Sequence, residues 1–389
     1  MLSVINVCTN SIDDLDVACE EILSQLKDKT LLKNSVGIIG CHSDYVEENV
    51  IAAIKESLPF DIVGCSALGT AVNGNGGLEQ LALTVLTSDD IVFSTALSDT
   101  ISKDDFDAPI EKVYAEAEKS LGTAPGLVFV FAPITEDVAG DRMLTKLTQL
   151  GGKVPIFGTL ANDTSSGYTK SYVFKNGEYD RFKMALIMMS GNINPRFHIT
   201  SIAKRNIQQN NAIVTGADGY LVTSINDMPV LDYFASLGIL TRKEHSIAPV
   251  TMIPFLVDFG DGTAPVAYSM YNISEDGAYC GGAIPQGSKI TFAEIDMVSI
   301  LETAEITLRA ALDDAEKNGA SGIVAIPCFA RAMVMTPSVE AEIVKSLEVI
   351  GDKIPFLLIY SGGEICPVYN KQQEPVNRFH NLTYTLMVF

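Results

Sequence analysis

The order of apolar and polar segments repeats three times along the chain. Each repeat predicts an apolar strand, an amphipathic helix, a second apolar strand, a glycine-rich loop and a return strand. In the first repeat the helix carries Val46, Val50, Ile54 and Leu58, four residues apart on one face. The predicted first strands are 36–39, 127–131 and 323–326, the second strands are 62–63, 154–157 and 356–360, and the return strands are 81–86, 184–189 and 382–389.

A glycine-rich loop follows the second strand of every repeat, at 64–69, 158–163 and 361–364. Strand–helix–strand crossovers are nearly always right-handed, and open α/β sheets bind ligands beyond the carboxyl ends of their strands. If the repeats pack in related ways, the three loops converge on one cleft, where glycine lets backbone N–H groups approach a ligand. The alternative is that each loop is an ordinary tight turn.

The pattern changes between the second and third repeats. Segments 211–224 and 275–277 predict β-hairpins, and 298–318 predicts a long amphipathic helix that ends before a glycine. A short polar run separates this region from the first two repeats. We therefore expect an α/β protein with mixed sheets and two domains, at residues 1–205 and 206–389.

The charge of the chain argues against two classes of partner. It has 48 acidic and 27 basic residues, for a net charge of −21, and the Lys and Arg residues are scattered. Phosphate backbones and anionic membranes attract clustered basic residues, so we expect neither nucleic acid nor membrane as a partner. The first residues lack the features of a signal peptide, and no run of about 18 apolar residues predicts a membrane span. Seven cysteines, an odd number, then indicate reduced thiols in the cytoplasm.

Few residues suggest catalysis or metal binding. Cys41 and His42 are adjacent, so their side chains point to opposite sides of a strand end and make a poor metal pair. Cys328 follows a predicted strand, and His380 is the histidine that could act as its base. A cysteine-dependent hydrolase that uses Cys328 and His380 is therefore an alternative function. No metal ion or cofactor is expected.

Motifs in both halves of the chain resemble the FIST family. Tyr360–Pro367 (Tyr-Ser-Gly-Gly-Glu-Ile-Cys-Pro) and Phe379–Thr383 (Phe-His-Asn-Leu-Thr) resemble the closing signature of the FIST C domain, and Cys328–Arg331 resembles its Cys-x-x-Arg element. Val63–Ala67 and Gly158–Asp163 resemble motifs of the FIST N domain. Thr159 and Asp227 stand where the family usually has glycine. The resemblance covers nearly the whole chain in the order typical of the family.

The resemblance implies a bacterial sensory module that binds a small molecule such as an amino acid and takes part in signal transduction. Relatives are often fused to kinase, chemoreceptor or cyclic-dinucleotide output domains. Since no length remains here for an output domain, we expect a stand-alone sensor that signals through a separate protein of one of these kinds. Some members are described as haem proteins that sense nitric oxide. Haem with His380 as its axial ligand is therefore a second alternative.

The matching residues fit a zwitterionic ligand. Arg331 offers a planar fork for a carboxylate, and Glu364 could accept an ammonium group. The alternative is that Arg331 and Glu364 pair only with each other. The full set of candidate ligand-binding residues is Gly64, Ser66, Thr70, Gly158, Asp163, Cys328, Arg331, Gly362, Gly363, Glu364, His380 and Asn381.

Overall fold

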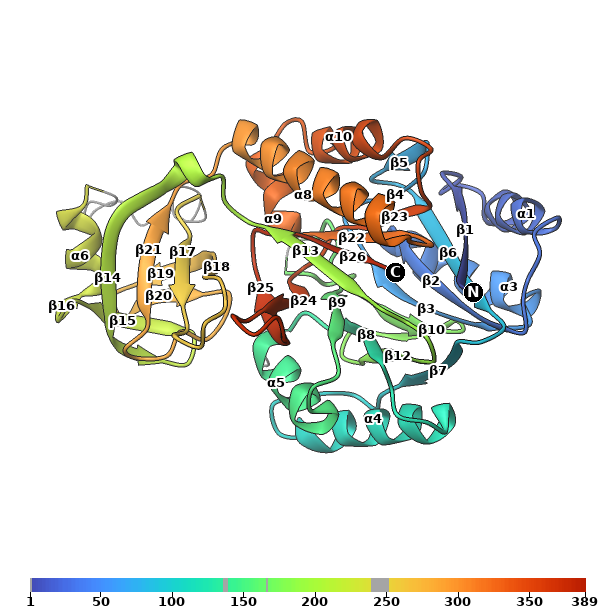
Figure 1. Cartoon of the computed structure of the whole chain (residues 1–389), viewed down its shortest axis with the longest axis horizontal. Coiled ribbons are helices and arrows are strands. Elements are labelled where there is room, and N and C mark those ends of the chain that lie inside the picture. The colour runs from blue at the N-terminus through green and yellow to red at the C-terminus, as the bar shows by residue number, and fades with distance from the viewer. Residues whose placement is uncertain (1, 136–138, 166, 239–251) are drawn as a thin grey trace.

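The computed structural model describes residues 2–135, 139–165, 167–238 and 252–389. It is a mixed α/β protein, as the sequence predicts, with an α/β body and a β-rich unit that stands beside it (Figure 1). The body contains three six-stranded sheets, and the β-rich unit contains one eight-stranded sheet. Three similar segments of the chain build the body, and they correspond to the three repeats of the sequence pattern.

The first repeat forms one sheet and the helices that cover it. Parallel strands β2 and β3 lie side by side, and the return strand β6 runs antiparallel on the other side of β2. Asp14 caps α1 by accepting a hydrogen bond from the Val17 amide. The elements are β1 (Leu2–Thr9), α1 (Leu15–Leu26), β2 (Asn34–Cys41), α2 (Ser43–Glu47), α3 (Val50–Glu56), β3 (Asp61–Ser66), β4 (Thr70–Val72), β5 (Asn75–Gly77) and β6 (Leu81–Ser88).

The second repeat has the same order and the same pairing. Parallel strands β8 and β9 are adjacent, and β12 is the antiparallel return strand next to β8. Every residue of β8 is buried, because helices cover one face of its sheet and the centre of the body covers the other. The elements are β7 (Val92–Leu97), α4 (Asp107–Leu121), β8 (Leu127–Ala132), α5 (Gly140–Gly151), β9 (Ile156–Leu160), β10 (Val173–Lys175), β11 (Glu178–Asp180) and β12 (Ala185–Ser190).

The β-rich unit interrupts the third segment of the body, between strand β13 and helix α8. The predicted long helix forms as α8, where Asp296 and Ser299 make a capping box and Gly319 ends the helix. Return strand β26 lies between β13 and β22, in the interior of the third sheet. The elements are β13 (Arg196–Thr200), α8 (Met297–Asn318), β22 (Ile323–Pro327), α9 (Phe329–Val334), α10 (Ala341–Ile350), β23 (Phe356–Ile359), β24 (Glu364–Tyr369), β25 (Pro375–His380) and β26 (Tyr384–Val388).

Each repeat donates a hairpin to the sheet of another repeat. The β10–β11 hairpin of the second repeat pairs with β3 of the first, and β4–β5 of the first repeat pairs with β23 of the third. The β24–β25 hairpin of the third repeat pairs with β9 of the second. The three exchanges form a closed cycle, so no repeat completes its sheet alone.

The three sheets enclose a common apolar centre. Their inner faces contribute Ile38, Phe129, Phe157, Val324 and Met387 to one buried cluster. Helices α1 and α3 cover the outer face of the first sheet, α4 and α5 that of the second, and α8 and α10 that of the third (Figure 1). The alternation of inward and outward side chains along each strand therefore divides the core into an inner cluster and three outer ones.

The β-rich unit, called the inserted unit below, connects β13 to α8. Its strand order is β18-β17-β21-β14-β15-β20-β19, with β16 paired to β15. Phe234 of α6 packs against Phe255 and Phe292, with ring centroids 6.1 and 5.8 Å apart. Both predicted hairpins form, as β14–β15 and β19–β20. The elements are η1, a 3-10 turn (Lys204–Asn206), β14 (Ile207–Asp218), β15 (Leu221–Ile225), β16 (Met228–Pro229), α6 (Val230–Ser236), β17 (Phe255–Asp258), β18 (Val266–Tyr268), β19 (Met270–Ser274), β20 (Gly277–Cys280) and β21 (Lys289–Ala293).

The predicted domain boundary at residues 205 and 206 lies within the short 3-10 turn between β13 and the inserted unit. Hydrogen-bonded strands from both sides of this boundary share sheets, since β13 pairs with β26 and β9 pairs with β24. The division into two folding units stays a prediction.

Candidate functional site

The three glycine-rich loops meet, as predicted from their common place in the repeats. Asn162 connects them, because its side chain accepts from the Leu68 amide at 2.7 Å and donates to the Tyr360 carbonyl at 2.6 Å. The Ser66 hydroxyl donates to the Asn162 carbonyl at 3.0 Å, and the Gly362 amide donates to the Leu160 carbonyl at 2.9 Å. The loops therefore use these groups to bind one another.

Several loop residues that we predicted to bind a ligand have structural contacts instead. A Cβ atom on Gly64 would overlap the Ile39 carbonyl of the neighbouring strand, and one on Gly158 would overlap the Val130 carbonyl at the matching register position. The two glycines therefore allow parallel strands to approach closely. Thr70 is fully buried and contacts Gln80 at 3.2 Å.

The remaining loop glycines and Asp163 are also engaged in packing. A Cβ atom on Gly362 would lie 2.9 Å from the Ala161 carbonyl, and one on Gly363 would lie 2.5 Å from the Phe379 ring. Asp163 accepts hydrogen bonds from the Ser165 and Lys170 amides at 2.6 Å each, which fixes its loop.

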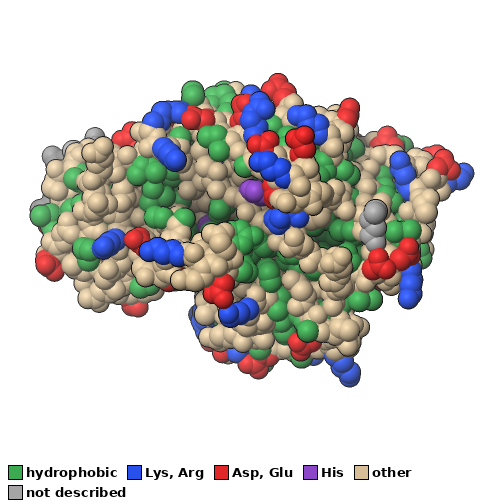
Figure 2. Space-filling view, viewed as in Figure 1, with side chains coloured by type: hydrophobic (Ala, Val, Ile, Leu, Met, Phe, Trp, Pro, Cys, Tyr) green, Lys and Arg blue, Asp and Glu red, His purple; other side chains and the backbone are tan. Residues whose placement is uncertain are grey.

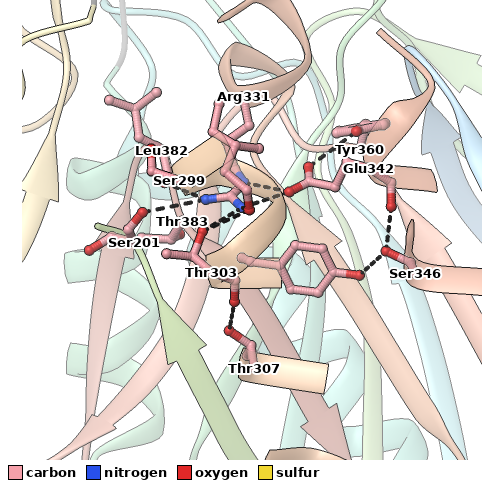
Figure 3. A network of polar contacts seen from close by, with 12 residues as sticks. Ser201, Ser299, Thr303, Thr307, Arg331, Glu342, Ser346, Tyr360, Leu382 and Thr383 are labelled. Atoms are coloured by element: carbon pink, nitrogen blue, oxygen red, sulfur yellow. Dashed lines mark hydrogen bonds and ion pairs between the residues drawn. The ribbon is translucent and has the colours of Figure 1, made fainter. Parts of the chain in front are cut away.

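Arg331 lies at the centre of a buried polar network (Figure 3). Its Nε and Nη2 atoms donate to Oε1 of Glu342, a fully buried residue of α10, at 2.9 and 2.6 Å. Nη1 donates to the Leu382 carbonyl at 3.2 Å, and Nη2 also donates to the Ile300 carbonyl and to Thr303. Every guanidinium nitrogen thus has an acceptor within the protein.

This network corrects both interpretations of Arg331 drawn from the sequence. Its fork is not open to a ligand carboxylate, and its ion-pair partner is Glu342 rather than Glu364. Tyr360 donates to the second carboxylate oxygen of Glu342 at 3.1 Å, and the guanidinium lies 5.6 Å from the centre of the Tyr384 ring. Sequence reasoning missed Glu342 because it predicted the surrounding helix from the spacing of its apolar residues and did not consider its charged residues.

Glu364, at the start of β24, has a different environment. Its Oε2 accepts from the Thr383 hydroxyl at 2.6 Å and from the Thr383 amide at 3.2 Å. Its Oε1 is buried and has no hydrogen-bond partner among the residues that the structure describes. The Cys328 thiol lies near the carboxyl group and lowers its pKa, but no hydrogen bond of good geometry joins Cys328 to Oε1. Burial raises the pKa of Glu364 to about 8, against the lowering effect of Thr383.

Asn381 provides a second buried acceptor near Glu364. The two residues are close because Glu364 pairs with His380 in the β24–β25 ladder, and Asn381 follows His380. The Asn381 side chain is 6% exposed, and its Oδ1 has no hydrogen-bond partner in the described part of the chain. It packs against Gly281 of the inserted unit so closely that a Cβ atom there would overlap the amide group. The backbone amide of Asn381 donates to the Ala267 carbonyl of the same unit at 3.2 Å.

Cys328 and His380 lie in this region, but their properties do not support the hydrolase alternative. Burial and the nearby Glu364 carboxyl raise the pKa of Cys328 well above its usual value, whereas a cysteine nucleophile needs a lowered pKa. His380 is buried, its Nε2 donates to the Cys366 carbonyl at 2.9 Å, and burial lowers its pKa to about 4. A base with so low a pKa does not take a proton from a thiol near neutral pH.

The same contacts do not fit a haem group. An axial histidine needs a ring nitrogen that faces the iron and room for the macrocycle. His380 is 1% exposed and uses Nε2 for the Cys366 carbonyl. In the described ranges, no group of three or more His, Cys, Asp or Glu side chains is placed to hold a metal ion.

On the surface shown in Figure 2, basic and acidic side chains are intermingled, and the surface is hollowed where the inserted unit meets the body.

None of the described helices is long and apolar enough to cross a membrane.

Comparisons with known proteins identify the class of protein. The model of the FIST N domain matches residues 35–228, and that of the FIST C domain matches residues 232–367. The chain therefore belongs to the FIST family. FIST domains are sensory signal-transduction modules that are thought to bind small ligands.

No curated protein matches the chain. Among solved structures, a crystal structure of cyanuric acid hydrolase from A. caulinodans is similar over 100% of this chain and 98% of that chain, with 11% sequence identity and a TM-score of 0.33. A TM-score this low supports no conclusion about function.

Proposed function

We propose that this chain is a cytoplasmic sensor whose ligand is an amino acid or a similar small zwitterion, with Glu364 as the anchor of the ligand ammonium group. The observation that carries the proposal is the buried Oε1 of Glu364, which no described residue of the chain meets with a hydrogen bond. Native proteins satisfy nearly all buried polar groups, so an unpaired carboxylate oxygen indicates a missing donor.

An ammonium group suits this position better than a neutral donor. The unpaired Oδ1 of Asn381 belongs to the turn that follows the same hairpin, and it adds a second acceptor. An ammonium group carries three N–H donors and a positive charge, which would offset the cost of burying an ionised Glu364. Arg331 does not belong to the proposed site, because Glu342 and main-chain carbonyls occupy its donors.

The proposal predicts that binding releases a proton. With a pKa of about 8, Glu364 of the empty protein is mostly protonated at neutral pH. A bound ammonium would lower that pKa, so the carboxyl group would ionise as the ligand enters. Calorimetry in two buffers of different ionisation enthalpy measures this proton.

A thermal-shift screen of the common amino acids tests the proposal directly. A ligand that binds the folded chain raises its melting temperature. Glu364→Gln should weaken binding of the stabilising amino acid by roughly 1–3 kcal/mol, or about 5- to 150-fold. It should leave binding of the deaminated 2-hydroxy analogue unaffected. Glu374→Gln is the matched control, because Glu374 lies in the exposed turn of the same hairpin and pairs with Lys153. Unchanged amino-acid affinity in Glu364→Gln would exclude Glu364 as the anchor.

The sensor would pass its signal to a separate signalling protein such as a kinase, a chemoreceptor or a cyclic-dinucleotide enzyme. The intermingled surface charges in Figure 2 suit a protein partner better than nucleic acid. The family assignment supports a role in signal transduction.

A further inference from the structure

The turn between β25 and β26 contains a backbone conformation that is unusual for its residue. Leu382 has a φ of 58°, in the left-handed region, and its side chain is 1% exposed. A bulky L residue adopts this conformation only where its surroundings enforce it. The residues that enforce it here connect Glu364 to the inserted unit.

Hydrogen bonds hold the turn from two sides. Arg331 Nη1 donates to the Leu382 carbonyl at 3.2 Å, and this guanidinium is fixed by Glu342 (Figure 3). On the other side, the amide and hydroxyl of Thr383 both donate to Glu364 Oε2. The peptide group that joins Leu382 to Thr383 is therefore clamped between a structural ion pair and the proposed ligand anchor.

The Leu382 side chain belongs to the contact between body and inserted unit. It packs in an apolar cluster with Leu256 of β17, Ala267 of β18 and Ala293 of β21. The neighbouring residue, Asn381, donates its amide to the Ala267 carbonyl. The turn is thus part of the contact that docks the inserted unit on the body.

We propose that the Asn381–Thr383 turn is a relay that couples occupation of Glu364 to the docking of the inserted unit. The coupling to ligand rests on the function proposed above. A ligand ammonium group at Oε1 ionises Glu364, and the ionised carboxylate accepts the two hydrogen bonds from Thr383 more strongly, which tightens this side of the clamp. In the empty protein the protonated carboxyl group holds Thr383 less firmly, so the left-handed conformation of Leu382 and its packing in the cluster are less well fixed. Ligand binding therefore tightens the docking of the inserted unit on the body, and a partner protein can read that change.

The relay can be tested without any ligand by removing the carboxyl group. Hydrogen exchange of the Asn381 amide reports docking, because that amide bonds to the inserted unit. Glu364→Ala should speed this exchange by about tenfold relative to Glu374→Ala, the factor expected from the strain of one left-handed residue. Amides of β8 should keep their protection in both variants. Thr383→Val, which removes only the hydroxyl donor, is a milder form of the same change.

A second substitution separates a relay from simple loss of packing. Leu382→Gly removes the strain, since glycine adopts the left-handed region freely. The Leu382→Gly variant also lacks the apolar side chain, so hydrogen exchange of its Asn381 amide is already faster than in the original chain. The relay predicts that adding Glu364→Ala to Leu382→Gly changes the exchange less than about twofold, because the two changes act through the same turn. Gln373→Gly is the control, because Gln373 has a φ of 62° in the exposed turn of the same hairpin.

Two results would overturn the relay. One is unchanged Asn381 exchange in both Glu364→Ala and Thr383→Val. The other is an equal effect of Glu364→Ala with and without Leu382→Gly. Because no ligand is used, either result is distinct from a failure of the amino-acid screen, which tests the proposed function alone.

Discussion

Removing the Arg331 guanidinium should destabilise the fold strongly, because it leaves a buried charge without its partner. Arg331 is 1% exposed and Glu342 is 0% exposed, so neither side chain can turn to water. Breaking one side of a buried ion pair typically costs about 3–5 kcal/mol. We therefore expect Arg331→Met to lower the free energy of unfolding by about 3–5 kcal/mol, and Glu342→Gln to do the same.

The double variant Arg331→Met/Glu342→Gln should cost much less than the sum of the two changes. It leaves no buried charge, and the remaining loss comes from the Leu382 and Ile300 carbonyls, which lose their donor, at about 1–3 kcal/mol each. The expected cost of the double variant is therefore about 2–6 kcal/mol, against about 6–10 kcal/mol if the effects were additive.

Urea unfolding followed by circular dichroism measures these values. Arg309 and Glu305 form an exposed pair one turn apart on α8, with Arg309 61% exposed, and serve as the control. Breaking the exposed pair should cost less than about 0.5 kcal/mol. A change below about 1 kcal/mol in Arg331→Met, combined with reduced binding of an amino acid, would refute the structural role and restore Arg331 as a ligand anchor.

Two further predictions concern pH and the C-terminal strand. Because the folded chain holds the Glu364 proton more tightly than the unfolded chain, the contribution of Glu364 to stability is complete below about pH 4.5 and is lost as the pH rises through about 8. Glu364→Gln should therefore gain stability relative to the original chain across that window in urea titrations, and a constant difference would contradict the raised pKa. Deletion of residues 385–389 removes most of β26 from the interior of the third sheet and should unfold the segment from residue 206 onward, as measured by its hydrogen exchange. Unchanged thermal stability would mean that the strand is dispensable.

Much of the fold was predictable because its signals are local. The three strand–helix–strand repeats follow from apolar periodicity within short windows, and α8 follows from its amphipathic pattern and Gly319. The hairpins of the inserted unit follow from turn residues between apolar segments. The FIST motifs pointed to the family that the domain matches confirm.

The candidate site was only partly predictable. Sequence reasoning selected Glu364 and Asn381, and the structure brings them together through the β24–β25 ladder. It paired Arg331 with the wrong carboxylate, because two residues in strand-end loops looked equivalent on sequence grounds. It did not anticipate that Gly281 and Ala267 of the inserted unit would cover Asn381, since they come from a segment a hundred or more residues earlier.

The sequence by itself therefore determined which segments of the three repeats are strands, helices and turns, and it singled out Arg331 and Glu364 as charged residues beside apolar strands. Only the tertiary structure decided which partners those charges meet. Hairpin exchange among the repeats places β24 beside β9 and β4 beside β23, and no local pattern encodes that choice. Long-range strand pairing depends on how whole apolar faces pack, and this packing sets the partner of Arg331, the unpaired oxygen of Glu364 and the strained turn at Leu382.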